Sequence, residues 1–163
     1  EVAEEAGVGK GTVYRHFGDK ENLFFEMVRS FLGEETDAVM VAAASSLPPR
    51  EKLIRVGEEM SEHIQRHNEY VRMMHRIPFS AKDAAPSHDI MREHHQRLNR
   101  VLGQLLRDAE QSGILCPGLD YDAIICIYKG MIMSRSIQRV HEGLDVSVAQ
   151  LVDLLLTGIG QAT

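Results

Sequence analysis

Residues 6–23 constrain the fold of this 163-residue chain more than any other stretch. Gly7 is expected to end a short helix, because glycine tolerates the left-handed backbone found just past a helix C-terminus. Gly9 can cap a second helix, on which Val13 and Phe17 lie four residues apart on one face that we expect to be buried. Two short helices joined by a glycine turn are typical of a helix-turn-helix.

The outward side chains of this second helix are of the kinds that contact DNA. Cationic and hydroxyl side chains bind phosphate, and a helix N-terminus with small residues can approach base edges in a groove. Asp19 is expected to cap the next helix, with Lys20 at its start. From this pattern alone, a helix-turn-helix used only for packing stays open as an alternative. The outward residues are Lys10, Gly11, Thr12, Tyr14, Arg15 and His16.

The full string AGVGKGTVYRHFGDKENL closely resembles the N-terminal domain of the TetR family of transcriptional regulators. That family carries a run of the type A-G-V-S-K-G-T-[L/V]-Y-x-H-F-x-[S/D]-K-E-x-L, and the resemblance covers residues 1 to about 27. Gly9 stands where the family usually has serine, so we do not predict Gly9 as a contact. The predicted DNA-binding residues are Lys10, Gly11 and Thr12 for base edges, Tyr14, His16 and Lys20 for phosphate, and Arg15 for either.

The resemblance also implies a helix that precedes Glu1 and packs over Val2, Val13, Phe17 and Leu23. Without that first helix, we expect the helix-turn-helix unit to be less ordered than the rest. We also expect this 163-residue piece to bind DNA poorly.

Composition and charge fit a regulator better than a protein that coats nucleic acid. The net charge is −6, with 44% hydrophobic and 26% charged residues, and DNA binding needs only a local positive surface. The two cysteines, Cys116 and Cys126, have no zinc spacing, and inert buried thiols are favoured over a redox switch. With no signal peptide and no apolar run near 18 residues, we predict a cytoplasmic protein without membrane contact.

Apolar residues that recur every three or four positions predict an all-α fold with no strands. One long helix is predicted from Asp19 to about Ala44, and others over residues 50–67, 70–77, 88–112, 121–141 and 148–159. We divide the chain into an N-terminally truncated helix-turn-helix DNA-binding domain, residues 1–31, and a larger helical ligand-binding and dimerisation bundle, residues 32–163.

The last two predicted helices carry more apolar residues than one buried face needs. That surplus indicates either two central core helices or a helix–helix dimer interface. The TetR resemblance implies the interface, because the family dimerises through its last two helices as a four-helix bundle. The predicted interface residues are Ile125, Ile132, Val148, Leu151, Val152 and Leu155.

Methionines and histidines gather on the middle helices. Methionine adapts to irregular apolar surfaces, so these residues indicate either ordinary core filling or a ligand pocket. The TetR resemblance supports a pocket for an apolar or amphipathic effector, between the helices that follow the long connector. The predicted lining is Met60, His63, His67, Met74, Met91, His94, Leu98, Tyr128 and Met131.

A metal site or an active site is not predicted. His63 and His67 are spaced four residues apart, which can bind a metal, but the glutamate of the metalloprotease motif is absent between them. Solvated histidines, or histidines that line a core or cavity, are the favoured interpretation, and we predict no metal and no cofactor. The sequence contains no nucleophile elbow or phosphate-cradling glycine loop, so we predict that the protein is not an enzyme.

These features predict a ligand-responsive transcriptional regulator, a repressor that binds a palindromic operator as a homodimer and is released by a small effector. Its predicted partners are double-stranded DNA, a second copy of itself and that effector. Two alternatives stay open: a dimeric helical ligand- or protein-binding module without DNA binding, and the disfavoured metal-dependent enzyme.

Overall fold

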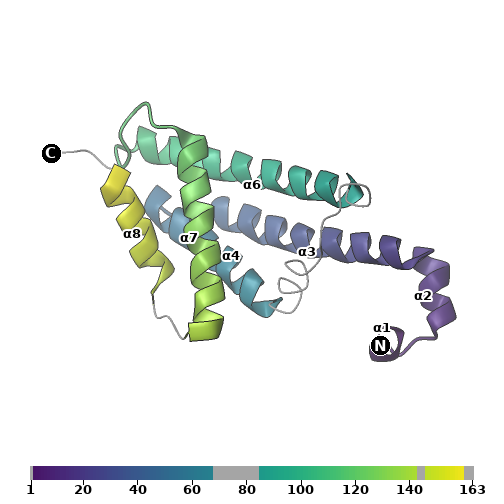
Figure 1. Ribbon diagram of the computed structural model, residues 1–163. Coiled ribbons are helices and arrows are strands. Elements are labelled where there is room, and N and C mark those ends of the chain that lie inside the picture. The colour runs from purple at the N-terminus through teal and green to yellow at the C-terminus, as the bar shows by residue number, and fades with distance from the viewer. Residues whose placement is uncertain (1, 68–84, 143–145, 160–163) are drawn as a thin grey trace.

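The computed structural model describes residues 2–67, 85–142 and 146–159, and every element in those ranges is an α-helix (Figure 1). The all-α prediction is therefore confirmed for the described part of the chain. The helix predicted over residues 70–77 lies outside it. The helices are α1 (Val2–Glu5), α2 (Lys10–Phe17), α3 (Lys20–Ala43), α4 (Pro49–Arg66), α6 (Ala85–Gln111), α7 (Tyr121–Glu142) and α8 (Val148–Ile159).

Local sequence signals explain where the first helices begin and end. Gly7 and Gly18 have φ of 66° and 80°, a backbone region that favours glycine, and each follows a short helix. The Gly18 N–H donates to the carbonyl of Tyr14 at 2.8 Å and ends α2. The Asp19 carboxylate accepts the N–H of Asn22 at 2.8 Å, which makes Asp19 the N-cap of α3, as predicted.

The helix α4 is the centre of the larger bundle. It packs against α3, α6, α7 and α8, while α3 also lies along α6. By contrast, α1 and α2 among the described elements contact only each other and the start of α3. Figure 1 shows α1 and α2 at one end of α3, away from α7 and α8. The long helix α3 is therefore the structural link between the two parts.

The core surrounds α4 and is built from buried residues of α3, α4, α6, α7 and α8. Val56, Ile132 and Val152 are each 0% exposed there. The hydroxyl of Tyr128 donates to the Leu53 carbonyl at 2.6 Å, and burial raises the pKa of this phenol far above its usual range. No helix of the described residues has the length and apolarity needed to cross a membrane.

Gly57 marks the closest approach of α4 to this core. A Cβ at Gly57 would lie 2.7 Å from the Tyr128 hydroxyl oxygen and from Val148 Cγ1, and 2.9 Å from Ile132 Cδ1. We expect Gly57→Ala to destabilise the fold by about 1–3 kcal/mol, the usual cost of overpacking. Urea unfolding measures the change.

Gly33 supplies the matched control. Like Gly57 it lies inside a helix, but a Cβ built at Gly33 meets no atom within 4 Å. Gly33→Ala should stabilise α3 by about 0.5–1 kcal/mol through the loss of chain entropy in the unfolded state. Equal effects of the two substitutions would contradict the assigned packing around Gly57.

Candidate nucleic-acid interface and ligand cavity

The small N-terminal unit is built on a turn between α1 and α2. The Val8 N–H donates to the Ala3 carbonyl at 2.9 Å, and Ala3 is buried. Val13 and Phe17, predicted to be buried, are half-buried in the structure, and among the described elements α2 packs only against α1 and α3. The predicted helix-turn-helix arrangement is thus present with one side of its small core uncovered among the described residues.

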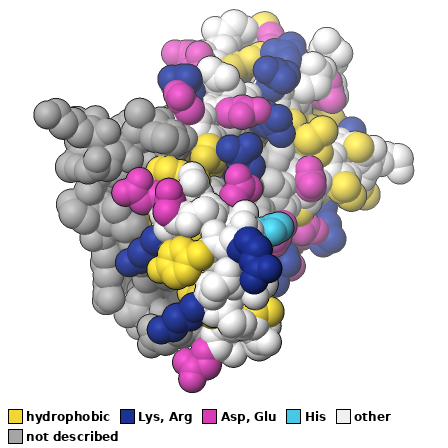
Figure 2. Space-filling model, turned by 90° about the vertical axis from the view of Figure 1, so that its right-hand side faces the viewer, with side chains coloured by type: hydrophobic (Ala, Val, Ile, Leu, Met, Phe, Trp, Pro, Cys, Tyr) yellow, Lys and Arg dark blue, Asp and Glu magenta, His cyan; other side chains and the backbone are white. Residues whose placement is uncertain are grey.

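All seven predicted DNA-contact residues are exposed to solvent. Lys10 is the first residue of α2 and Lys20 the first of α3, so two cations lie at two helix starts. Tyr14 is 58% exposed, and a Cβ at Gly11 would meet no atom within 4 Å. Figure 2 looks onto this end of the molecule and shows Lys and Arg side chains and a His near hydrophobic side chains, with Asp and Glu side chains also on this face.

The N-terminus of α2 is open to an anion. Gly9 has an extended backbone and no side chain that could cap the helix, whereas Asp19 caps α3 with its carboxylate. The first N–H groups of a helix need acceptors, and a phosphate oxygen can supply them. An uncapped, cationic helix start beside exposed Thr12 and Tyr14 therefore has the chemistry to bind a phosphate backbone and reach base edges.

A cavity of about 610 Å³ lies between α3 and α6. Its wall mixes apolar side chains, including Phe25, Leu32 and Ile90, with charged ones, including Arg29 and Arg97. This mixture suits an amphipathic molecule better than a purely apolar one. The remaining lining residues are Asn22, Glu26, Gly33, Thr36, Asp89, Glu93 and His94.

A buried polar link joins the two helices at the wall of this cavity. His94 Nε2 lies 3.0 Å from a carboxylate oxygen of Glu35, and His94 Nδ1 lies 3.0 Å from the Thr36 hydroxyl. That hydroxyl also donates to the Leu32 carbonyl at 2.8 Å. Both ring nitrogens of His94 are thus engaged by α3, so a ligand that contacts His94 would also affect α3.

The predicted pocket residues do not come together around this cavity. Of that set only His94 lines it, and Met74 lies outside the described residues. The apolar stripe of α4 faces the core, because α4 lies between α3 and α7. The spacing of these residues along α4 shows that they share a face, but not that this face meets the core and not a cavity. Met60, His63, Leu98 and Tyr128 are buried in the bundle, whereas His67, Met91 and Met131 are half-buried.

The predicted interface residues also need correction. Ile125, Ile132, Val148, Val152 and Leu155 are buried within this one chain, and Leu151 is half-buried, so five of the six are not available to a second copy. Because α7 is apolar nearly all round, periodicity could not tell its inner side from its outer side.

The outward sides of α7 and α8 nevertheless carry several exposed apolar side chains, besides polar ones such as Ser134 and Asp153. Ile127 is 51% exposed and Leu154 is 66% exposed. Cys126 is also exposed, contrary to the prediction of buried thiols, and Cys116 is half-buried. We call this surface the α7/α8 face; it consists of Cys126, Ile127, Gly130, Met133 and Leu154.

The sequence of the N-terminal unit matches known regulators. The sequence model of the family described as "Bacterial regulatory proteins, tetR family" matches residues 1–27. HTH-type transcriptional regulator BetI of Rhizobium meliloti (strain 1021) is 38% identical over 60 residues, which are 35% of this chain and 30% of BetI. The match therefore spans less than a third of that relative.

The fold of the whole chain is similar to solved regulators. The ketosteroid transcriptional regulator KstR2 of Mycobacterium tuberculosis superposes with a TM-score of 0.72 at 20% identity, over 98% of this chain and 83% of KstR2. The transcriptional regulator FadR of Bacillus subtilis, solved in complex with stearoyl-CoA, gives 0.73 at 18% identity, over 99% of this chain and 86% of FadR. At such identities the likeness shows the fold alone.

Proposed function

We propose that this chain, a TetR-family protein by its N-terminal sequence and by its fold, is a ligand-responsive regulator of transcription that binds DNA through α2. The observation that carries the proposal is the exposed, uncapped start of α2, with Lys10, Gly11 and Thr12 in its first turn. Among the described elements, the unit that contains α2 joins the rest through α3 alone. Residues 1–31 form the DNA-binding domain and residues 32–163 the effector and dimerisation domain, with α3 running through both.

The proposed assembly is a homodimer through the α7/α8 face. Two-fold symmetry would present two copies of α2 to successive major grooves of a palindromic site, with half-sites about 34–36 Å apart. A surface groove of about 430 Å³ beside this face, lined in part by Ile127, Met131 and Leu151, offers a place for side chains of a second copy. Repression follows if the operator overlaps a promoter.

The proposed effector is a small amphipathic molecule in the cavity between α3 and α6. Support comes from the mixed lining and from the FadR relative that was solved with stearoyl-CoA. An effector acts only through its different affinities for two conformations. Because α3 forms one cavity wall and leads directly into α2, a shift of α3 would change the separation of the two α2 helices in a dimer.

Phosphate and base contacts can be told apart by substitution in the protein expressed from its full reading frame. Tyr14→Phe removes one hydroxyl donor and should weaken all DNA sequences alike, whereas Lys10→Ala should relax the preference for the operator. Each is expected to cost about 1–3 kcal/mol if the contact is made. Fluorescence anisotropy with operator and scrambled DNA measures both, and Lys52→Ala on α4 is the cation-loss control. If Lys10→Ala lowered affinity for every sequence equally, Lys10 would be a phosphate contact instead.

The cavity can be tested with an amphipathic probe, the dye 8-anilinonaphthalene-1-sulfonate. A side chain at Gly33 would project into open space beside the cavity, so Gly33→Phe should lower dye affinity about tenfold by filling that space. Fluorescence titration gives the affinity, and Val41→Phe, at an exposed α3 position outside the cavity lining, is the matched control. Unchanged dye binding in Gly33→Phe would remove this cavity as the binding site.

A further inference from the structure

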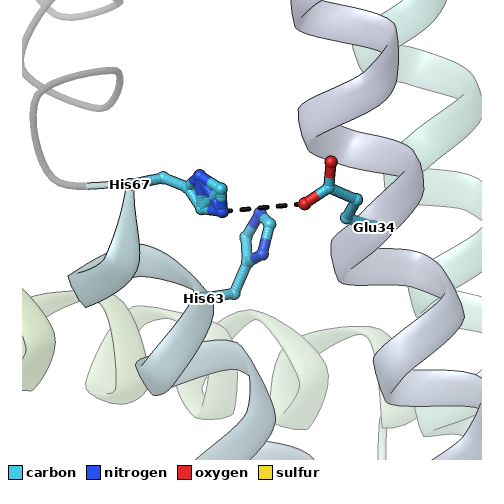
Figure 3. A group of neighbouring side chains, drawn as sticks. All are labelled: Glu34, His63 and His67. Carbon is cyan, nitrogen blue, oxygen red and sulfur yellow. Dashed lines mark ion pairs between the residues drawn. The ribbon is translucent and has the colours of Figure 1, made fainter.

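Three side chains with metal-binding atoms converge where α3 passes the end of α4. His63 and His67 come from α4, and Glu34 comes from α3 (Figure 3). One ligand atom from each residue lies within 4.8 Å of the others. His67 Nε2 is 3.7 Å from a carboxylate oxygen of Glu34, and the ring of His63 points toward the line between them in Figure 3.

His63 is the residue that points to a missing partner. It is 1% exposed, and among the described residues its Nε2 is a buried atom without a hydrogen-bond partner. Leaving such an atom unpaired costs about 1–3 kcal/mol, so buried polar atoms are normally satisfied. A cation that accepts this nitrogen as a ligand would remove that cost.

The surroundings of His63 and His67 favour metal coordination by their imidazole rings. The Phe31 ring lies 4.4 Å from the His63 ring and 5.3 Å from the His67 ring, centroid to centroid, which restricts their rotation. Burial lowers the pKa of His63, since it disfavours the imidazolium, and a neutral imidazole keeps the lone pair that a metal needs. The negative charge of Glu35 acts in the opposite direction and raises the pKa of His63, while the charges of His67 and Arg66 lower it further.

We propose that His63, His67 and Glu34 form a binding site for a divalent transition metal, with Zn²⁺ the best fit to two imidazoles and one carboxylate. Ligand atoms around tetrahedral Zn²⁺ are about 3.3–3.4 Å apart, given metal–ligand bonds of about 2.0–2.1 Å. Small rotations of the partly exposed Glu34 and His67 side chains bring the three atoms to that separation. A fourth position is left for water or another ligand.

The site would join α3 to α4 beside the polar link that Glu35 makes with His94. A bound metal would therefore fix the middle of α3 relative to the bundle. Any effect of this on DNA binding rests on the proposed function, whereas metal binding itself does not.

The test is equilibrium dialysis of the chelator-treated protein against Zn²⁺, with the bound metal measured by mass spectrometry. We expect one Zn²⁺ per chain, and Glu34→Gln and His67→Ala should each weaken binding about tenfold or more. Glu26→Gln on α3 and His95→Ala on α6 are the matched controls, and both replace exposed residues outside the cluster. Circular dichroism verifies that all four variants are folded.

Co²⁺ supplies a second readout that reports ligand geometry. The wild type should give the visible absorption bands of Co²⁺ in a low-symmetry site, and Glu34→Gln should change them. The proposal is overturned if the wild type binds no Zn²⁺, or if the control variants weaken binding as much as Glu34→Gln and His67→Ala do. Neither readout involves DNA. A protein that binds no metal could therefore still be a DNA-binding regulator, and a protein that binds no DNA could still bind Zn²⁺ at this site.

Discussion

Gly11→Glu is expected to abolish specific DNA binding while leaving the fold intact. Gly11 is exposed and a Cβ built there meets no atom within 4 Å, so we expect the folded protein to accept a glutamate. In the proposed complex, however, the new carboxylate would separate the first turn of α2 from the base edges and repel nearby phosphates. Several contacts of about 1–3 kcal/mol each are then lost, which gives an affinity loss of about 100-fold or more. Fluorescence anisotropy with operator DNA measures it.

Val41→Glu is the matched control for this charge change. Val41 is 75% exposed near the other end of α3, and its replacement adds the same single negative charge. It should change DNA affinity by less than about twofold, because charges beyond a Debye length of about 10 Å are largely screened. A Gly11→Glu protein that binds operator DNA like Val41→Glu would show that α2 does not enter the DNA groove.

Ile127→Glu is expected to convert the proposed homodimer into a monomer. Ile127 is 51% exposed on the α7/α8 face, so the isolated chain tolerates a charge there. Within a dimer, the carboxylate would be buried beside its symmetry mate without a partner, at a cost of several kcal/mol. Dimer affinity should fall about 100-fold or more, since every 1.4 kcal/mol is tenfold. Sedimentation equilibrium measures the change.

The same variant should also lose operator affinity, because a monomer reaches only one half-site. Val41→Glu again serves as the control, since it places a glutamate at an exposed apolar position on another helix. If Ile127→Glu remained a dimer while Val41→Glu dissociated, the assembly would use α3 and not the α7/α8 face.

Local signals predicted the N-terminal unit well. Gly7 and Asp19 act through their own backbone and their nearest neighbours along the chain, so their effects can be read without knowing the fold. The start of α3 at Lys20 and the exposure of Tyr14 follow directly from such signals. The helix boundaries agree with the predicted ones within a few residues for the same reason.

Sites built between helices could not be predicted in this way. A 3.6-residue period shows which residues share a face, but not which helix that face meets. The period therefore predicts His63 as a pocket residue, whereas it is buried beside Phe31 of α3. Nothing in the sequence points to Glu34, because only the pairing of α3 with α4 brings its carboxylate to His67. Periodicity likewise could not show that Ile125 and Ile132 lie on the buried side of α7, because α7 is apolar nearly all round.

The central claim is that two copies of α2 read DNA together. Its most direct test is hydroxyl-radical footprinting of the protein, expressed from its full reading frame, on the DNA upstream of its own gene. We expect two protected half-sites related by a two-fold axis, with centres about one helical turn apart, or a multiple of it, and their loss with Gly11→Glu. A wild-type protein that is folded and dimeric yet protects no site on that DNA, and binds it no better than scrambled DNA, would contradict the claim.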